Sequence, residues 1–393
     1  MLNERFDLPL QIPMTHRVCF TRGAFSPGSE LVVDLLREGG GRRALVFIEQ
    51  SVVDHWPQLA HEISETLAKA DVALAAIEIH EGGESAKNDE DLVRDVWSAV
   101  ERGKIDRHSY ILCIGGGAFL DAVGYGAATA HRGVRLMRFP TTTLSQDDSG
   151  VGVKNGINCF GKKNWIGSFA VPYAVVNDFQ FLFTQDETTR QIGLIEALKV
   201  ALVKDGTFFE WMVDHANQLA LGNEEALIEC VKRSALLHAR HITTGGDPFE
   251  MGSSRPLDFG HWAAHKLEQL SAFSMSHGHA VSIGLWLDVI YSVKSGYLPE
   301  IVSKKIGRVM ETIGFPQYDE LLSQRDATGK LAVVAGLEEF REHLGGRLTI
   351  LLLQAAGKSV EVHAMNENWI EECIESMRDH SFAMIESSKD RVY

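Results

Sequence analysis

The chain has 393 residues and a formal net charge of −15, with 45% hydrophobic and 23% charged residues. This length exceeds what one hydrophobic core usually fills, so we expect two domains. The acidic balance excludes binding of nucleic acid through a basic surface, and any anionic substrate must meet locally grouped lysines and arginines. Five cysteines without a CxxC pair predict reduced thiols. No apolar run is long enough to span a membrane, so we expect a cytoplasmic protein without a membrane partner.

Short apolar runs alternate with helical patterns over the first half of the chain. Runs of this length, separated by segments with 3.6-residue periodicity, predict buried parallel strands with helices on both faces of a sheet. The predicted strands are ALVFIE (44–49), VALAAIEI (72–79), YILCIG (110–115), VRLMRF (134–139) and YAVVND (173–178). The helical segments between them include DLVRDVWSAVERG and AFLDAVGYGAATA.

Long helical patterns replace the strands after about residue 185. They are TTRQIGLIEALKVALVKD, EEALIECVKRSALLHARHI, HWAAHKLEQL and HAVSIGLWLDVIYSVKS, with a short return to β structure in RLTILLL and SVEVHAM. We therefore predict a Rossmann-like α/β domain over residues 1–183 and a mainly helical domain over residues 184–393. The cleft between two such domains is a natural place for a ligand.

Three glycines, Gly115, Gly116 and Gly117, stand between a predicted strand and a predicted helix. Glycine lets the backbone approach a pyrophosphate, and a helix N-terminus offers unpaired N–H groups and a positive dipole end. The string reads GGGxxxD, ending at Asp121, and does not match GxGxxG. A dinucleotide site and a plain tight turn both remain open from this string alone.

Polar side chains at the ends of other predicted strands favour the dinucleotide site. Glu49 ends the first strand, Glu84 and Lys87 follow the second, and hydroxyls including Thr141 and Thr142 follow the fourth. Ligands bind at this edge of an α/β sheet. The alternatives are a solvated Glu49 and a surface ion pair between Glu84 and Lys87.

A glutamate and two histidines far apart in the sequence form a candidate metal site. Glu196 interrupts the apolar helix LIEALKVAL, where a buried carboxylate needs a cation. His261 and His277 add two imidazoles, and His265 lies one helical turn after His261. This ligand set suits a divalent metal with one open coordination position. His238 and His241 are alternative ligands, which we interpret as structural.

A second group of candidate site residues is cationic. Lys154, Lys162, Lys163 and Asn164 fall in a predicted glycine-rich loop, and Arg132 precedes it. Lysines beside flexible backbone N–H groups suit a phosphate ester. A solvated basic loop is the alternative. Downstream, Lys199 shares a helix face with the glutamate of the candidate metal site.

Together these motifs resemble the dehydroquinate synthase-like sugar-phosphate cyclases, a family that includes dehydroquinate synthase and the 2-epi-5-epi-valiolone synthases. The matching strings run from about residue 81 to 284 in the family's order. They are GGESAK, GGGAFLDAVGYGAAT, HRG, PTTTLSQDDSGVGVKNGIN, GKKNWIG, IEALKVALVKD, DFGHWAAH and HGHAV.

The resemblance implies NAD in the first domain and zinc or cobalt held by Glu196, His261 and His277. It places cofactor contacts at Glu49, Glu84, Lys87, Gly115, Gly116, Gly117, Asp121, Thr141, Thr142 and Lys163. It gives catalytic or phosphate-binding roles to Asp148, Lys154, Asn164, Lys199 and His265, and it implies homodimers in which Arg132 reaches the neighbouring subunit's site. The implied reaction oxidises a hydroxyl of a small sugar phosphate, eliminates phosphate, returns the hydride and closes a carbocycle by an aldol step.

The chain departs from the dehydroquinate synthases at several positions. Their carboxylate-binding arginine is Ser254 here, followed by Arg255, and their asparagine is Asp258, which we count with the catalytic residues. Their paired C-terminal lysines are Arg341 and Glu342, and HGE reads HGH with His279. Losing an arginine–carboxylate pair favours a neutral-headed heptulose 7-phosphate substrate. Alternatives are 3-dehydroquinate synthase itself, a metal-dependent polyol dehydrogenase of the glycerol dehydrogenase type, or a non-catalytic sensor.

Overall fold

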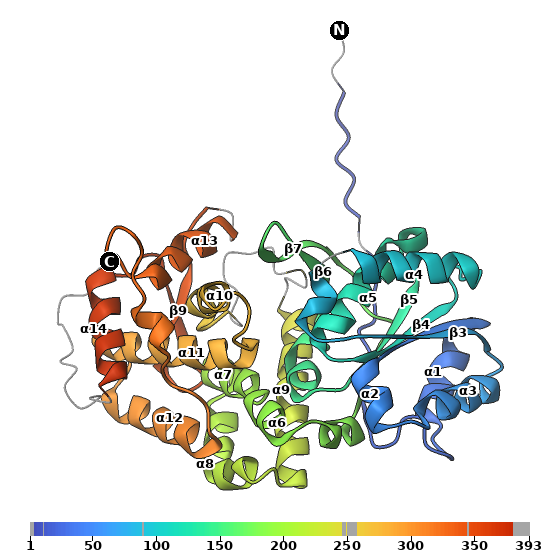
Figure 1. Cartoon of the computed structure of the whole chain (residues 1–393), viewed down its shortest axis with the longest axis horizontal. Helices are drawn as coiled ribbons and strands as arrows, with labels where there is room; N and C mark the ends of the chain where they lie inside the picture. The colour runs from blue at the N-terminus through green and yellow to red at the C-terminus, as the bar shows by residue number, and fades with distance from the viewer. Residues whose placement is uncertain are drawn as a thin grey trace.

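The computed structural model describes residues 4–10, 12–88, 90–245, 249, 258–343 and 346–379. Its first half is built on a six-stranded parallel sheet in the order β1–β8–β5–β4–β2–β3 (Figure 1). The strands are β1 (Val18–Thr21), β2 (Arg43–Glu49), β3 (Ala73–His80), β4 (Tyr110–Gly115), β5 (Arg135–Pro140) and β8 (Ala174–Asp178). The five predicted strands are confirmed, and β1 is an additional strand at the edge.

Helices cover both faces of this sheet because the central strands bury side chains on both sides. In β2, Val46 and Ile48 pack toward one cluster, and Leu45 and Phe47 pack toward the other. The first cluster is closed by α1 (Leu31–Gly39), α2 (Gln50–His55) and α3 (Leu59–Lys69), and the second by α4 (Asp91–Arg102) and α5 (Gly117–Thr129). This two-sided burial explains why the strands are continuous apolar runs.

The lysine-bearing segment is a β-hairpin, which corrects the predicted glycine-rich loop. β6 (Lys154–Cys159) pairs with β7 (Lys162–Phe169) in antiparallel register. Gly156 lies opposite Gly167, and a Cβ at either position would lie within 2.6 Å of backbone oxygen across the pair. The glycines that indicated a loop are therefore needed for close strand pairing.

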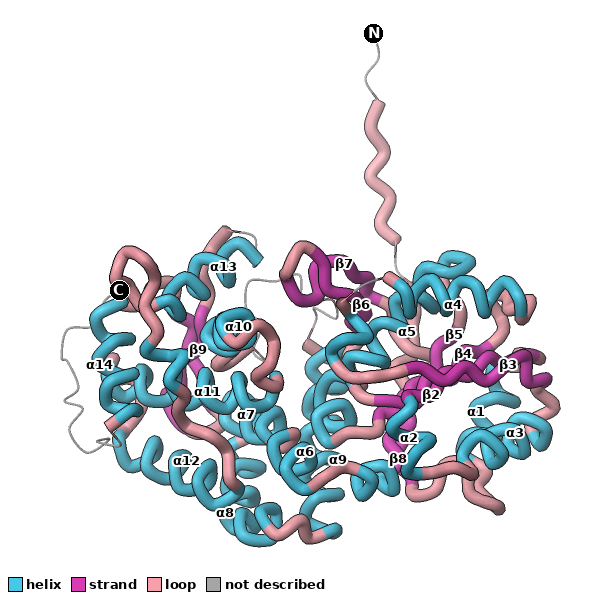
Figure 2. Tube along the Cα trace, viewed as in Figure 1, coloured by secondary structure: helices cyan, strands magenta, loops and turns pink. Residues whose placement is uncertain are grey.

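Helices dominate the second half, together with a small antiparallel pair of strands (Figure 2). One large hydrophobic cluster, from Phe179 to Met377, forms its core. The helices are α6 (Glu187–Ile192), α7 (Ile195–Lys204), α8 (Gly206–Ala220), α9 (Glu224–Thr244), α10 (His261–Leu270), α11 (His277–Lys294), α12 (Glu300–Ile313), α13 (Ala335–His343) and α14 (Glu367–Arg378), and the strands are β9 (Ile350–Ala355) and β10 (Lys358–Val362). Across the described ranges, every helix is too short or too polar to cross a membrane.

The predicted long helix around Glu196 is broken into α6 and α7. A Cβ on Gly193, between them, would lie 2.7 Å from both the Thr143 side chain and the Leu144 backbone. The chain therefore bends where it touches the segment that follows β5. This break places Glu196 in the first turn of α7, facing the sheet's carboxyl edge.

A buried carboxyl group in α11 ties α10 to its neighbour. Asp288 is fully buried and accepts hydrogen bonds from the Gly260 N–H (2.9 Å) and the Trp262 indole N–H (2.8 Å). These two donors flank His261 in the sequence. Asp288 therefore fixes the start of α10, where a candidate metal ligand lies.

We predict that Asp288→Ala lowers the free energy of unfolding by about 2–5 kcal/mol, because two buried N–H groups lose their acceptor. Chemical denaturation would measure this loss. Asp214→Ala, on the exposed face of α8, is the matched control and should change stability by less than about 0.5 kcal/mol. Equal effects of the two substitutions would contradict the role of Asp288.

The same group makes stability depend on pH. Burial raises the pKa of Asp288 to about 7, although the hydrogen bonds from Trp262 and Gly260 oppose the increase. Its contribution to stability is therefore complete below the unfolded-state pKa of about 4 and is lost as the pH rises through 7. The stability advantage over Asp288→Asn should be about 2 kcal/mol larger at pH 5 than at pH 8.

Candidate functional site

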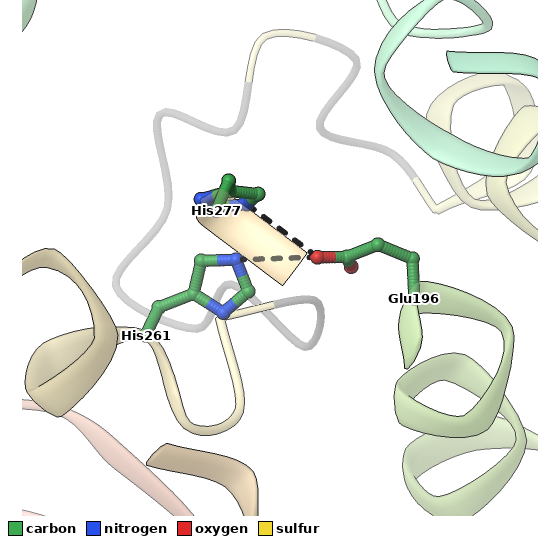
Figure 3. Close-up of side chains that lie close together, drawn as sticks. All are labelled: Glu196, His261 and His277. Atoms are coloured by element: carbon green, nitrogen blue, oxygen red, sulfur yellow. Dashed lines mark ion pairs between the residues drawn. The ribbon is translucent and has the colours of Figure 1, made fainter. Parts of the chain in front are cut away.

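Three helix starts bring Glu196, His261 and His277 together, as Figure 3 shows. Glu196 Oε1 lies 3.5 Å from His277 Nε2 and 3.9 Å from His261 Nε2. One ligand atom from each residue lies within 4.8 Å of the others, a spacing that can hold a metal ion. The predicted convergence of these three residues is thus present in the structure.

Two glycines let the histidine-bearing helices approach closely. Gly260 precedes α10 with φ of +80°, a conformation that favours glycine, and a Cβ there would lie 2.5 Å from the Leu285 backbone nitrogen. A Cβ on Gly284 in α11 would lie 2.2 Å from the Gly260 oxygen. The close contact between α10 and α11 brings His261 and His277 near each other, with ring centroids 5.6 Å apart.

The glutamate of this cluster is buried with a lysine beside it. Glu196 and Lys199 have side chains only 1% and 2% exposed and form an ion pair. Burial would lower the pKa of Lys199, but the charges of Glu196 and Asp148 raise it, so Lys199 stays cationic. Among the described residues, Glu196 Oε1 has no hydrogen-bond donor. A buried carboxylate oxygen without a donor suits a cation.

The two histidines differ in their protonation. Burial and the positive charge of Lys199 lower the pKa of His261 well below its usual value, so its imidazole is neutral. Burial would also lower the pKa of His277, but the charges of Glu268 and Glu196 raise it to about 10. The negative charges of these two glutamates favour the protonated form of His277. A bound divalent cation would neutralise the same negative charges in place of that proton. The residues therefore fit a divalent metal.

Glu268 contacts the ring nitrogen of His277 that faces away from Glu196, and it was not among the predicted site residues. Its fully buried Oε1 lies 3.2 Å from His277 Nδ1 and accepts a hydrogen bond from Lys163 (2.6 Å). A carboxylate behind a ligating histidine orients the ring and increases its basicity. Glu268 lies three residues after His265, so helical periodicity could have identified it.

His238, which the sequence led us to interpret as structural, lies beside the predicted catalytic residue Asp148. Its Nδ1 is 2.8 Å from Asp148 Oδ1, and its side chain is 9% exposed. Burial would raise the pKa of Asp148, but Lys199 and His238 together lower it, so the carboxylate is ionised. No local pattern indicates this pair, because the two residues are 90 positions apart.

Glu49 packs against the turn formed by Gly115, Gly116 and Gly117, which we call the glycine turn. Its Oε2 accepts a hydrogen bond from the Gly116 N–H (2.7 Å), and a Cβ on Gly82 or Gly115 would collide with its side chain. Thr142, which follows β5, hydrogen-bonds Ser145 through its hydroxyl (2.8 Å). These side chains and Gly117, the first residue of α5, lie at the carboxyl edge of the sheet, where ligands of α/β folds bind.

Glu84 and Lys87 each pair with a different residue and not with each other. Lys87, only 4% exposed, pairs with Asp121 (2.8 Å) and contacts Asn164 Oδ1. Glu84 lies 3.4 Å from Lys163. The surface ion-pair interpretation is therefore wrong, because both residues contact the β6–β7 hairpin and Lys87 also pairs with α5.

Two cavities adjoin the cluster of Glu196, His261 and His277, which we call the metal cluster. The larger, about 670 Å³, extends from Thr142 and α6 to His277 and Tyr318. The smaller, about 460 Å³, is lined by the hairpin, by α10 and by α13, with His265 and Asn164 in its wall. The His265 ring lies 5.4 Å from the His261 ring, so this cavity reaches the metal cluster.

The other predicted residues are more dispersed. Arg132 is exposed beyond the far end of α5, about 20 Å from the glycine turn, so it does not join the cluster of Glu196, His261 and His277. Lys154 is exposed at the start of β6, and Thr141 is buried at the end of β5. Asp258 contributes to the raised pKa of Lys199. Arg341 pairs with Glu338 on its own helix, whereas Ser254 and Arg255 lie outside the described residues.

The sequence matches the family described as 3-dehydroquinate synthase N-terminal over residues 77–191 and the family described as 3-dehydroquinate synthase C-terminal over residues 193–331. The chain belongs to the 3-dehydroquinate synthase family. The resemblance to these sugar-phosphate cyclases is confirmed, and with it the predicted fold class and the assignment as an enzyme of this family.

Relatives of this family match along most of the chain. A 3-dehydroquinate synthase from Halorhodospira halophila is 31% identical, covering 76% of this chain and 81% of that protein. A 2-epi-5-epi-valiolone synthase from Streptomyces hygroscopicus subsp. jinggangensis, solved with NAD+ and Zn2+ bound, has a TM-score of 0.85 at 24% identity, covering 96% of this chain and 100% of that chain. A 2-deoxy-scyllo-inosose synthase complexed with carbaglucose-6-phosphate, NAD+ and Co2+ has a TM-score of 0.72 at 20% identity, covering 91% and 96%. Both structures have the same fold as this chain.

We predict a graded loss of metal in three variants of this family member. Glu196→Gln removes a ligand and should lower zinc affinity by roughly hundredfold or more, whereas Glu268→Gln removes only the support of His277 and should lower it by about 10–100-fold. His61→Ala, exposed on α3, is the control and should bind zinc like wild type. Metal content after dialysis, with circular dichroism to verify folding, would measure this series. Wild-type affinity in Glu196→Gln would contradict the ligand assignment.

Proposed function

We propose that this chain is an NAD- and divalent-metal-dependent sugar-phosphate cyclase that converts a phosphorylated ketose of the heptulose 7-phosphate type to a carbocycle and releases inorganic phosphate. The convergence of Glu196, His261 and His277 between two cavities is the observation that carries the proposal. Residues 1–183 would bind the dinucleotide, and residues 184–393 would supply the metal ligands.

Bound NAD would accept and return a hydride, and a zinc or cobalt ion would polarise the reacting oxygen. The chain's own residues would position the reactants. Glu268 fixes the His277 ring, and Lys199 holds a positive charge against Glu196, so the ligand atoms stay in place before substrate enters. Asp148, ionised and 24% exposed, presents a negative charge at the edge of this cluster.

The phosphate of the substrate would bind at the smaller cavity. Asn164 and His265 line it, and Lys162 adds a cation that is exposed on the hairpin. Lys154, at the start of the same hairpin, would complete the phosphate site. Departure of phosphate needs cations and a proton donor, and this wall combines lysines, an amide and an imidazole.

The charges of the same cavity favour a substrate with one anionic group. Three glutamates line it, namely Glu268, Glu339 and Glu342. Lys163 is already paired with Glu268, and Glu339 is paired with Lys266. With Lys162 engaged by the phosphate, and Lys163 by Glu268, a second anionic group such as a carboxylate would meet Glu342 with no further lysine or arginine in the described wall. A neutral polyol head avoids this repulsion.

A second candidate is 3-dehydroquinate synthase itself, because the matched relatives at 31% identity and above carry that name. Its substrate carries a carboxylate as well as a phosphate. A metal-dependent polyol dehydrogenase is a further alternative, and it would release NADH stoichiometrically, whereas a cyclase recycles NAD within each turnover.

Phosphate release by the purified, zinc-loaded protein with NAD tests these candidates. We expect release of phosphate from a heptulose 7-phosphate without net formation of NADH. A chelator should abolish this activity, and added zinc should restore it. Turnover of the carboxylated heptulosonate 7-phosphate alone would identify a 3-dehydroquinate synthase. Stoichiometric NADH without phosphate would identify a dehydrogenase, and binding without turnover of either substrate would identify a sensor.

We also predict that His238 holds the Asp148 carboxylate in the orientation that catalysis needs. His238→Leu should lower kcat by about tenfold or more, because Asp148 loses a charge-assisted contact. His238→Gln, whose amide can still donate to Asp148, should retain more activity and shift the pH profile less. Equal activities of the two variants, at equal zinc content, would indicate that His238 only fills space.

A further inference from the structure

The segment before β1 is an extended N-terminal arm, defined here as residues 4–15, of which residue 11 is not described. Figure 1 shows the arm leaving the body of the protein in a straight line. Every second residue of the arm is a large apolar residue. Their exposed fractions are 78% for Phe6, 85% for Leu8, 83% for Leu10, 70% for Ile12 and 59% for Met14. A period of two is the pattern of a strand with one buried face.

The two prolines of the arm restrict how such a strand can pair. In an extended strand, alternate residues direct their N–H and C=O groups to the same edge. Pro9 and Pro13 lie on the edge of the polar positions and lack N–H groups there. The apolar positions, from Phe6 to Met14, keep every N–H on the opposite edge. The arm can therefore join a sheet as its last strand, with the prolines preventing further strand addition.

The β6–β7 hairpin offers a matching acceptor. Among the described residues, β7 (Lys162–Phe169) pairs only with β6, which contacts α5, and the other edge of β7 has no strand partner in that part of the chain. Three aromatic side chains of the hairpin are exposed: Phe160 by 77%, Trp165 by 55% and Phe169 by 46%. β7 has eight residues, close to the nine from Phe6 to Met14. Edge and apolar surface thus occur together at β7.

The unpaired edge of β3 (Ala73–His80) is a poorer acceptor. It carries only one exposed large hydrophobic side chain, Ile79, among the described residues. Two ion pairs, Glu78 with Arg102 and His80 with Asp95, place charges on this strand. Charged side chains on an edge strand oppose strand addition.

We propose that two copies of this chain exchange their N-terminal arms, each arm adding a strand to the outer edge of β7 in the partner copy. The end of the arm next to β1 is held in place, because His16 Nε2 lies 2.8 Å from the oxygen of Val151, three residues before β6. Even so, within one chain the arm extends away and both apolar surfaces remain exposed. A reciprocal exchange buries the same pair of surfaces twice and closes the assembly as a symmetric dimer. It also places the arm on the strand that carries Lys163 and Asn164.

Leu8→Asp/Leu10→Asp tests the arm, and Trp165→Asp tests the acceptor. Sedimentation analysis of the full chain should give a dimer for wild type and at least a tenfold weaker dimer dissociation constant for both variants. Leu221→Asp is the matched control, because Leu221 is 83% exposed at the end of α8 and remote from both surfaces. It should dimerise like wild type. A monomeric wild type, or an unchanged dissociation constant in the variants, would overturn the proposal.

Disulfide cross-linking separates exchange between copies from docking within one chain. A Leu10→Cys chain mixed with a differently tagged Trp165→Cys chain should yield a cross-linked species that contains both tags. Leu221→Cys in place of Leu10→Cys is the control and should yield none. A cross-link that forms only when one chain carries both cysteines would show that the arm docks on its own hairpin, and the proposal would fail. Neither experiment depends on catalytic activity, so the proposed function is tested separately.

Discussion

The structure depends on the burial of a charged carboxylate at the first turn of α7. Removing a carboxylate from water costs several kcal/mol unless cations and hydrogen bonds replace the water. Glu196 is met by Lys199 on its own helix and by two histidines at the starts of α10 and α11. The helix break at Gly193 and the close contact of α10 with α11 both serve this arrangement. Lys199 and the two histidines therefore offset part of the cost of burying Glu196 at this site.

The ionic network that begins at Glu196 also joins the two halves of the molecule. Lys163 in the hairpin pairs with Glu268 in α10, and Asp148 after β5 lies against His238 in α9. Each pair puts a group from the sheet edge against one from the helices. These largely buried contacts restrict how far the two halves can separate at this point. A ligand bound at the glycine turn is thereby held close to the metal cluster.

The parts of this site that the sequence could predict are those with a local signal. The central strands were predictable because burial on both faces makes them uniformly apolar, and Glu196 because a lone charge interrupts an apolar helix. The hairpin was taken for a loop, since its glycines serve cross-strand contacts that only pairing shows. The contact of His238 with Asp148 and the role of Glu268 were not predicted, because only tertiary packing brings these residues near their partners. The break before α7 likewise follows from a contact with Thr143.

Two of the departures from the family pattern, Arg341 and Glu342, lie outside the network around Glu196. Glu342 is exposed on the rim of the smaller cavity, and Arg341 pairs with its neighbour Glu338 on the surface of α13. Changing such residues leaves no buried charge without a partner, so the cost in stability is small. A change at Glu196 or Glu268 would leave lysine and histidine charges buried and unpaired. The reaction type is therefore tied to the stability of the core, whereas the identity of the substrate's remote end is decided by side chains that can vary at little cost.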